Sequence, residues 1–276
     1  MDLFVSAPTQ YIEVDGVSFA YRRFGKLGGV PVVGFQHFTG TLDNWDPIIM
    51  NGLAKQREVI VFDNKGVGNS GGVTPDSVYA MTQDAIRFIE QLGITQMDVL
   101  GFSLGGFIAQ QLAVLRPALI RKIMIVGAAP QGAKALHSFP DLIQRAMQLA
   151  PAERFLFIFF TPTEASREKG RAALARLQWR VEDRDKATSD AAVMAQLKAI
   201  TAWGTDAVSI DVTRIKHPVL VVQGSNDDMM DSSSSYTLFQ QLPNALLSCY
   251  PDAAHGSFFQ YPHLFVHEAL YFLDHY

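Results

Sequence analysis

A serine at the centre of a glycine-bracketed pentapeptide is the first candidate for chemistry in this chain. Residues 101–105 read Gly-Phe-Ser-Leu-Gly and match G-x-S-x-G, with Ser103 in the middle. The apolar run at 99–102 predicts a buried strand before the serine, and the amphipathic segment at 104–115 predicts a helix after it. A serine on such a sharp strand-to-helix turn can attack a carbonyl. A purely structural serine is the alternative, and the flanking strand and helix favour the nucleophile.

A serine nucleophile needs a histidine that takes its proton and an acid that orients the histidine. Proteins that hold the serine at a strand-to-helix turn carry the acid after the serine and the histidine last. The apolar run at 219–222 predicts a buried strand, and Asp227 follows it in a loop, next to Asp228. Of the seven histidines, His255 alone lies in a loop after a predicted strand in that order. These side chains and the serine form the candidate triad.

The elements that must position these residues follow the pattern of a parallel sheet covered by helices. A hairpin comes first, with alternating segments 11–14 and 17–21 on either side of the turn pair Asp15-Gly16. Continuous apolar runs then alternate with helical periodicity, as strands buried on both faces require. The runs are 31–35, 59–62, 99–102, 123–126 and 219–222, and the helical segments include 76–92 and 104–115. The predicted fold class is α/β, with a mostly parallel central sheet flanked by helices.

The alternation of strands and helices stops between residues 129 and 205. This stretch contains no strand-like run, and four segments read as helix: 141–149, 152–160, 164–182 and 190–203. We expect a core domain made of residues 1–128 and 206–276, with 129–205 inserted as an all-helical cap, or lid. Such an insertion would lie over the strand ends, where open α/β sheets bind ligands. The aromatic run at 155–160 and Trp179 are candidates for lining a substrate pocket, with plain helix packing as the alternative.

Four motifs give the sequence a resemblance to a known family. They are the serine motif extended by Gly106, the run Asp63-Asn64-Lys65-Gly66-Val67-Gly68-Asn69-Ser70, the strand end from Gly224 to Asp227, and Ala254-His255-Gly256. From the hairpin to the final helix, the chain resembles the serine-dependent, cofactor-free α/β-hydrolases with a cap, a group that includes enol-lactonases, aryl esterases, non-haem haloperoxidases and C–C bond hydrolases. The resemblance implies that Ser103 is the nucleophile, His255 the base and Asp227, rather than Asp228, the orienting acid. It implies no cofactor.

The loop expected to stabilise the negatively charged oxygen of the reaction departs from the family pattern. Many relatives carry His-Gly nine residues ahead of a tryptophan, whereas the position nine residues ahead of Trp45 holds Gln36, with His37 after it. An oxyanion hole uses backbone N–H groups, so a changed side chain need not abolish it. The resemblance implies that the N–H groups of Phe38 and Leu104 form the hole. His37 is a candidate for the substrate pocket, and a structural, hydrogen-bonded role is favoured over a catalytic one.

Composition and motifs argue against several other classes of protein. The 276 residues carry 23 Lys and Arg against 27 Asp and Glu, a formal charge of −4 without a basic run, which disfavours a nucleic-acid binder. The G-x-G-x-x-G match at 66–71 does not open a helix directly, so we expect no dinucleotide site. No cluster of His, Cys or carboxylates has the spacing of metal ligands, so we expect no metal.

The sequence also predicts a soluble, cytoplasmic protein without a membrane span. The start, Met1 to Pro8, lacks the basic and apolar regions of a secretory signal. The densest apolar run, 155–160, is too short to span a bilayer. The single cysteine, Cys249, cannot form an internal disulfide, which fits a reducing compartment. We expect its side chain to be inert and buried within a strand.

These observations together predict that the chain hydrolyses a small to medium, largely apolar carboxylic ester or lactone through an acyl-enzyme. The expected partner is therefore a small-molecule substrate. The sequence leaves three alternatives open: C–C bond hydrolysis on the same triad, perhydrolase or haloperoxidase activity on it, and a ligand receptor without catalysis. The oligomeric state, a homo-oligomer included, is left open as well.

Overall fold

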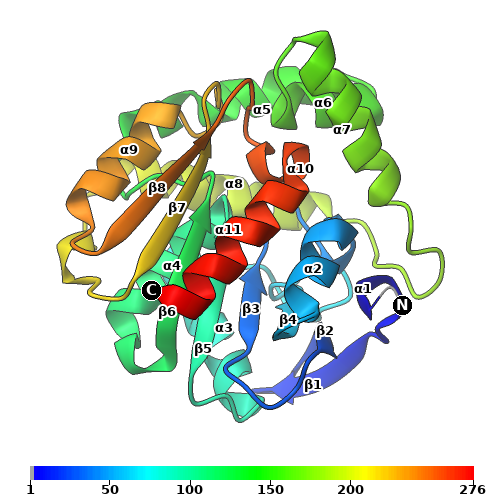
Figure 1. The fold of residues 1–276 in the computed structure, drawn as a ribbon, viewed down its shortest axis with the longest axis vertical. Helices are drawn as coiled ribbons and strands as arrows, with labels where there is room; N and C mark the ends of the chain where they lie inside the picture. Colours follow the sequence, from blue (N-terminus) through cyan, green and yellow to red (C-terminus); the bar gives the residue numbers. More distant parts are fainter. Residues whose placement is uncertain (1–2) are drawn as a thin grey trace.

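The fold is built on one eight-stranded sheet. The structure, a computed structural model, describes residues 3–276. The strands are β1 (Gln10–Val14), β2 (Val17–Gly25), β3 (Val32–Phe35), β4 (Glu58–Phe62), β5 (Met97–Phe102), β6 (Ile120–Val126), β7 (Val219–Gly224) and β8 (Ala245–Tyr250). Their order in the sheet is β1-β2-β4-β3-β5-β6-β7-β8 (Figure 1). β1 pairs with β2 and β2 with β4 in antiparallel fashion, and the remaining pairs are parallel. The predicted α/β class with a mostly parallel sheet is confirmed.

The N-terminal hairpin forms as its turn sequence predicts. Val14 pairs with Val17 across the two-residue turn, whose residues Asp15 and Gly16 have φ angles of 50° and 76°. Positive φ at both central positions is the geometry that matches the twist of paired strands, and Asp-Gly adopts it readily. The hairpin therefore closes one edge of the sheet with antiparallel strands.

Helices cover both faces of the sheet because alternate side chains of each strand point to opposite sides. Val99 belongs to the core under α3 (Val78–Gln91), α4 (Leu104–Leu115) and α9 (Ser232–Gln241), whereas Leu100 belongs to the core under α2 (Pro47–Ala54) and α11 (Pro262–His275). β4, β5 and β7 are buried along their whole length, which explains their continuous apolar sequences. Short helices α1 (Leu3–Ser6) and α10 (Ser257–Gln260) pack on the second side.

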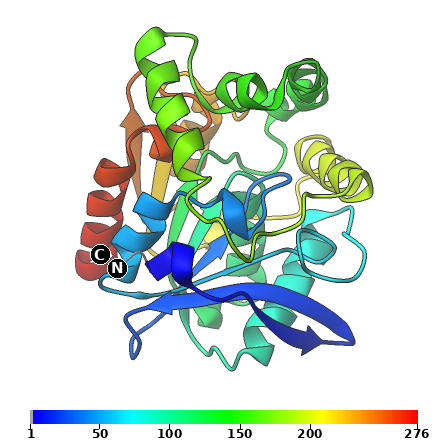
Figure 2. The ribbon, with the colours of Figure 1, turned by 90° about the vertical axis from the view of Figure 1, so that its right-hand side faces the viewer.

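Between β6 and β7 the chain forms helices only. They are α5 (Phe139–Met147), α6 (Pro151–Phe159), α7 (Glu164–Arg176) and α8 (Asp190–Thr205). Figures 1 and 2 show α5, α6 and α7 above the carboxyl ends of the strands. The described chain also holds four short 3-10 helices, η1 (Leu42–Asn44), η2 (Pro117–Leu119), η3 (Lys134–Ser138) and η4 (Val212–Arg214).

One of the four predicted helices of this region is shorter than expected. The prediction of helix over 164–182 is wrong at its end, because α7 stops at Arg176. Beyond it, the guanidinium of Arg180 donates to the carbonyl oxygens of Val5 (2.7 Å) and Ala7 (2.9 Å), and Asp183 adopts a φ of 51°. These long-range contacts hold residues 177–189 as an irregular strap across the molecule, against their helical pattern.

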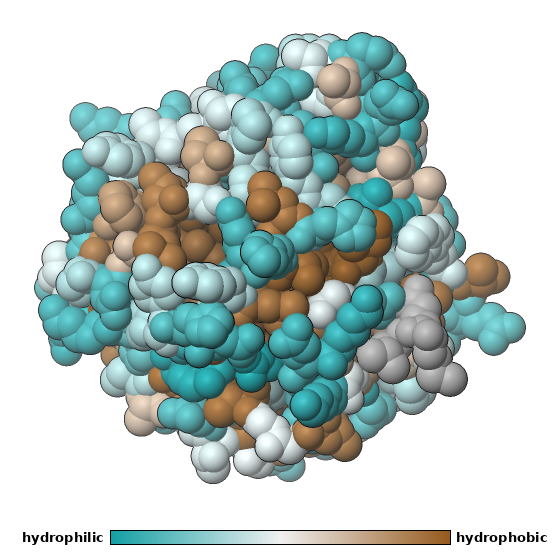
Figure 3. Space-filling model, in the orientation of Figure 1, coloured by the Kyte–Doolittle hydropathy of each residue, from teal (hydrophilic) through white to brown (hydrophobic). Residues whose placement is uncertain are grey.

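The edge strand β8 leaves part of its surface uncovered. Its residues are mostly half-buried, and Figure 3 shows apolar side chains gathered over it. Cys249 is exposed here, so the expectation that it lies in the core is wrong, since an edge strand has a neighbour on one side only. No helix in the described part of the chain combines the length and apolar character needed to span a bilayer. The expectation about a leader rests partly on Met1 and Asp2, which lie outside the described residues.

Candidate active site

Ser103 occupies a strained turn between β5 and α4. Its φ is 55° and ψ is −116°, a combination that non-glycine residues rarely adopt, and its side chain is buried. The turn is possible because two neighbours lack a side chain: a Cβ at Gly101 would lie 2.5 Å from the carbonyl oxygen of Gly105, and a Cβ at Gly105 would collide with that of Phe35. The two glycines of the motif therefore relieve the crowding that a side chain would cause in this turn.

His255 and Asp227 meet from two other loops. His255 Nδ1 lies 2.9 Å from Asp227 Oδ2, and both side chains are buried. The other carboxylate oxygen accepts hydrogen bonds of 2.9 Å from the N–H groups of Met229 and Met230. Asp228, the competing acid, is exposed. The carboxylate is thus anchored by backbone donors and aimed at one ring nitrogen of the histidine.

The surroundings of Asp227 favour its ionised form. Burial alone would raise the pKa of Asp227, but the charge and hydrogen bond of His255 and the backbone N–H groups of Met230 and Met229 together hold that pKa below its ordinary value. A carboxylate in this state fixes the histidine tautomer with the proton on Nδ1. Nε2 is then the basic nitrogen.

Two buried polar atoms of the candidate triad have no hydrogen-bond partner among the described residues. They are Ser103 Oγ and His255 Nε2, and both residues line the cavity. Buried polar atoms without partners cost stability and call for an explanation. A nucleophile and its base supply one, because such pairs are often loosely aligned before substrate arrives. Ser103 and His255 therefore line one cavity, and Asp227 is joined to His255 by a hydrogen bond.

The loop after β3 is shaped to present backbone donors. The N–H of Gly40 donates to the carbonyl of His37 at 3.0 Å, and Thr39 adopts a φ of 63°, so residues 37–40 form a tight turn. Leu104 is the first residue of α4, a position whose N–H has no acceptor within the helix. The oxyanion hole formed by the N–H groups of Phe38 and Leu104 stays a prediction.

Residues of the helical segment 129–205 hold this turn. Gln196 of α8, fully buried, accepts a hydrogen bond of 2.6 Å from the N–H of Thr39. The hydroxyl of Thr188 donates to the carbonyl of Thr39 at 2.7 Å. Both backbone polar groups of Thr39 are thus satisfied by side chains of this segment. Sequence reasoning missed Gln196 and Thr188, since a polar residue near an amphipathic helix gives no signal of the backbone it will meet.

His37 is a buried, hydrogen-bonded histidine. Its Nδ1 lies 2.7 Å from the carbonyl oxygen of Phe38, and its ring packs edge-on against Phe102 and Phe159, with centroids 5.1 and 5.4 Å away. Burial lowers the pKa of His37 to about 4, against a smaller opposing effect of the Phe38 carbonyl and with some help from the charge of His255. The ring is therefore neutral near pH 7 and donates from Nδ1.

The lowered pKa of His37 makes stability depend on pH. Between pH 6.5 and about 4 the unfolded chain takes up a proton at His37 while the folded chain does not, so the free energy of unfolding falls as the pH falls. The contribution of His37 to the free energy of unfolding is fully present above pH 6.5. It has fallen by about 3 kcal/mol near pH 4. Urea unfolding between pH 7 and 4 should show a flatter pH dependence for His37→Gln than for the native protein.

A histidine on the surface provides the control for this experiment. His263 is exposed on α11, and His263→Gln should follow the native pH dependence. Parallel curves for His37→Gln and the native protein would contradict the assignment of the effect to His37.

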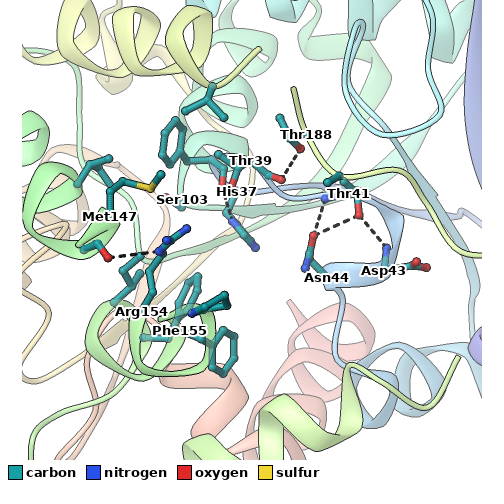
Figure 4. A pocket seen from close by; sticks show the side chains of 18 of the residues that line it. His37, Thr39, Thr41, Asp43, Asn44, Ser103, Met147, Arg154, Phe155 and Thr188 are labelled. Carbon is teal, nitrogen blue, oxygen red and sulfur yellow. Dashed lines mark hydrogen bonds between the residues drawn. The ribbon is translucent and has the colours of Figure 1, made fainter. Parts of the chain in front are cut away.

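The triad opens into a cavity of about 660 Å³. In Figure 4, Ser103 and His37 lie between two unlike arms. One arm lies against α5 and α6 and is mainly apolar, with Ile143, Ala146, Met147, Pro151, Phe155, Ile158 and Phe159, together with Arg154. The other lies against the loop after β3 and the strap, and is mainly polar, with Thr39, Thr41, Asp43, Asn44 and residues 184–188. The predicted role of the 155–160 run as a pocket wall is confirmed for Phe155, Ile158 and Phe159.

The prediction that Trp179 lines the pocket is wrong. Trp179 is not among the lining residues, and 49% of its surface is exposed. It follows the end of α7 in the strap, three residues past Arg176, because the helix that was expected to continue through it stops. Of the two segments predicted to line the pocket, α6 does so and the segment with Trp179 does not.

The similarity of this chain to known proteins extends over most of its length. Residues 31–262 match the family model described as alpha/beta hydrolase fold. A solved alpha/beta hydrolase fold protein from Chitinophaga pinensis is 64% identical, with a TM-score of 0.98 over 99% of both chains. A Rhizobium rhizogenes protein, provisionally named carbamate hydrolase RutD, is 25% identical over 85% of this chain and 88% of its own. A non-heme chloroperoxidase of Streptomyces lividans is 24% identical over 94% and 97%.

Proposed function

This chain belongs to the alpha/beta hydrolase fold family, and on that premise we propose that it is a serine hydrolase that cleaves a small to medium carboxylic ester or lactone. The observation that carries the proposal is the meeting of Ser103, His255 and Asp227 at one cavity, with Ser103 Oγ and His255 Nε2 free for chemistry. A cavity of about 660 Å³ suits a ligand of that size.

The reaction follows from the protonation state of the triad. His255 Nε2 takes the hydroxyl proton of Ser103 as the oxygen attacks the carbonyl carbon, and Asp227 stabilises the imidazolium through Nδ1. The N–H groups of Phe38 and Leu104 stabilise the oxyanion of the tetrahedral intermediate. Collapse of the intermediate expels the alcohol, which takes the proton from Nε2. Water, activated by His255, then releases the acid from Ser103.

In this proposal residues 129–205 are the cap and residues 1–128 and 206–276 are the core domain. The cap supplies the aromatic wall of the cavity from α6 and reduces the amount of water around the reacting atoms, which strengthens the electrostatic interactions there. Catalysis needs no metal or cofactor. The single thiol, Cys249, is exposed. A free thiol stays reduced in a reducing compartment, so we place the enzyme in the cytoplasm.

The test is turnover of p-nitrophenyl esters with acyl chains of two to twelve carbons, combined with a fluorophosphonate probe. We expect sustained turnover with a preference for short and medium chains, because the cavity volume limits the acyl group. Peptide mass spectrometry should locate the probe on Ser103. Folded protein that neither turns over any ester nor reacts with the probe would contradict the proposal and favour a ligand receptor.

A further inference from the structure

The basic side chain in the apolar arm of the cavity has no acidic partner among the described residues. Three basic residues line the cavity: Arg154, Arg184 and Lys186. Arg184 lies 3.4 Å from Asp43 and Lys186 is exposed, and both belong to the polar arm. Arg154 makes no ion pair with any carboxylate in the part of the chain that the structure describes, and its contacts are with backbone oxygens. A positive charge therefore faces the cavity uncompensated.

The guanidinium of Arg154 is held in place from behind. Nε donates to the carbonyl of Ala146 and Nη2 to that of Leu149, each at 3.2 Å, at the carboxyl end of α5. These contacts cap the helix, which is their structural role. They leave Nη1 without a partner among the described residues. In Figure 4 the guanidinium is turned toward the cavity, on the side where Ser103 lies.

The surroundings would strengthen the attraction of Arg154 for an anion. Its neighbours in the lining, Met147, Phe155 and Ile158, are apolar, and a charge interaction gains strength where water is displaced. Of the acidic residues of the lining, Asp43 and Asp185 belong to the polar arm, and Asp190 is the first residue of α8. A free planar edge of an arginine is suited to the two oxygens of a carboxylate.

We propose that Arg154 binds a carboxylate of the substrate. The substrates would then be esters or lactones that also carry a free acid group. The proposal rests on the proposed function, since it places the scissile carbonyl at Ser103 and the acid in the apolar arm. The rest of that arm then contacts the apolar linker between the two groups.

The test compares substrates that differ only by the acid. Mono-p-nitrophenyl esters of the dicarboxylic acids from succinate to adipate are paired with p-nitrophenyl alkanoates of equal chain length, and 6-acetoxyhexanoate is paired with hexyl acetate in a pH-stat to place the acid on the alcohol side. In the series that is hydrolysed with the higher kcat/KM, native protein should show a higher kcat/KM for the substrate with the acid group than for its neutral partner. Arg154→Gln should lower that preference by about 10- to 100-fold and change the neutral esters less than twofold. Arg154→Lys should keep part of it.

A second arginine of the cap serves as the matched control. Arg171 on α7 is exposed, pairs with Glu164 and does not line the cavity, so Arg171→Gln should leave the preference unchanged. Equal preference in native protein and Arg154→Gln, for both series, would overturn the proposal while neutral-ester turnover still supports the hydrolase.

A binding measurement separates this proposal from the proposed function. Titration calorimetry of Ser103→Ala with monomethyl adipate should give binding that weakens at least tenfold in the double variant with Arg154→Gln. Dimethyl adipate should bind both proteins equally. Loss of the difference overturns the role of Arg154 even if no ester is turned over, and its presence supports that role whatever the reaction.

Discussion

Ser103→Ala is expected to lower kcat for ester hydrolysis by about 10⁵- to 10⁶-fold, to the background of the folded protein. The alanine lacks the oxygen that becomes acylated, and His255 and Asp227 then have no nucleophile to serve. Alanine keeps a Cβ at φ 55°, where serine already has one, so the turn between β5 and α4 should persist. The measurement is kcat with p-nitrophenyl butyrate, together with the loss of fluorophosphonate labelling.

Another buried serine makes this result specific. Ser257 at the start of α10 also has a buried hydroxyl without a partner among the described residues, but it does not line the cavity. Ser257→Ala should therefore retain kcat within about twofold, since the substitution changes neither the candidate triad nor the lining of the cavity. Activity above one percent in Ser103→Ala, at native purity and fold, would rule Ser103 out as the nucleophile.

Asp227→Asn is expected to lower kcat by about 10⁴-fold with little effect on folding. The new amide can still accept from Met229 and Met230 through its oxygen, so the loop keeps its anchors. Its NH₂ group, however, donates to His255 Nδ1 and stabilises the tautomer with the proton on Nε2. That nitrogen then cannot take the proton of Ser103. Steady-state kinetics and the thermal unfolding midpoint together test this expectation.

The neighbouring acid provides the comparison. Asp228 is exposed, and the carboxylate bonded to His255 is that of Asp227, so Asp228→Asn should behave as the native protein in kcat and KM. If Asp228→Asn lost activity and Asp227→Asn kept it, the orienting acid would have been assigned to the wrong residue of the pair.

The sequence was sufficient to predict those parts of the molecule that local chemistry dictates. The Asp15-Gly16 turn, the buried strands and the glycines around Ser103 each follow from what one short segment needs, and the order of strand ends then brings Asp227 and His255 together. The errors arose where distant contacts decide the outcome. Trp179 and the end of α7 depend on the contacts of Arg180 with Val5 and Ala7.

Two other features were beyond local patterns for the same reason. The exposure of Cys249 depends on the place of β8 at the sheet edge, which follows from the strand order and not from the residues of β8. The contact between Gln196 and Thr39 joins residues 157 positions apart, and no spacing rule connects an amide in a helix to a particular backbone N–H. Arg154 is similar, since only the full set of neighbours reveals that it lacks an acid.

The two hydrogen bonds that tie Thr39 to Gln196 and Thr188 join segment 129–205 to the turn that carries Phe38. In the proposed enzyme this segment is the cap, and the turn supplies one donor of the oxyanion hole. A displacement of α8 from the core would break the bond between Gln196 and Thr39 and free one side of that turn. We therefore expect the proposed oxyanion loop to be held in place only while the cap covers the cavity.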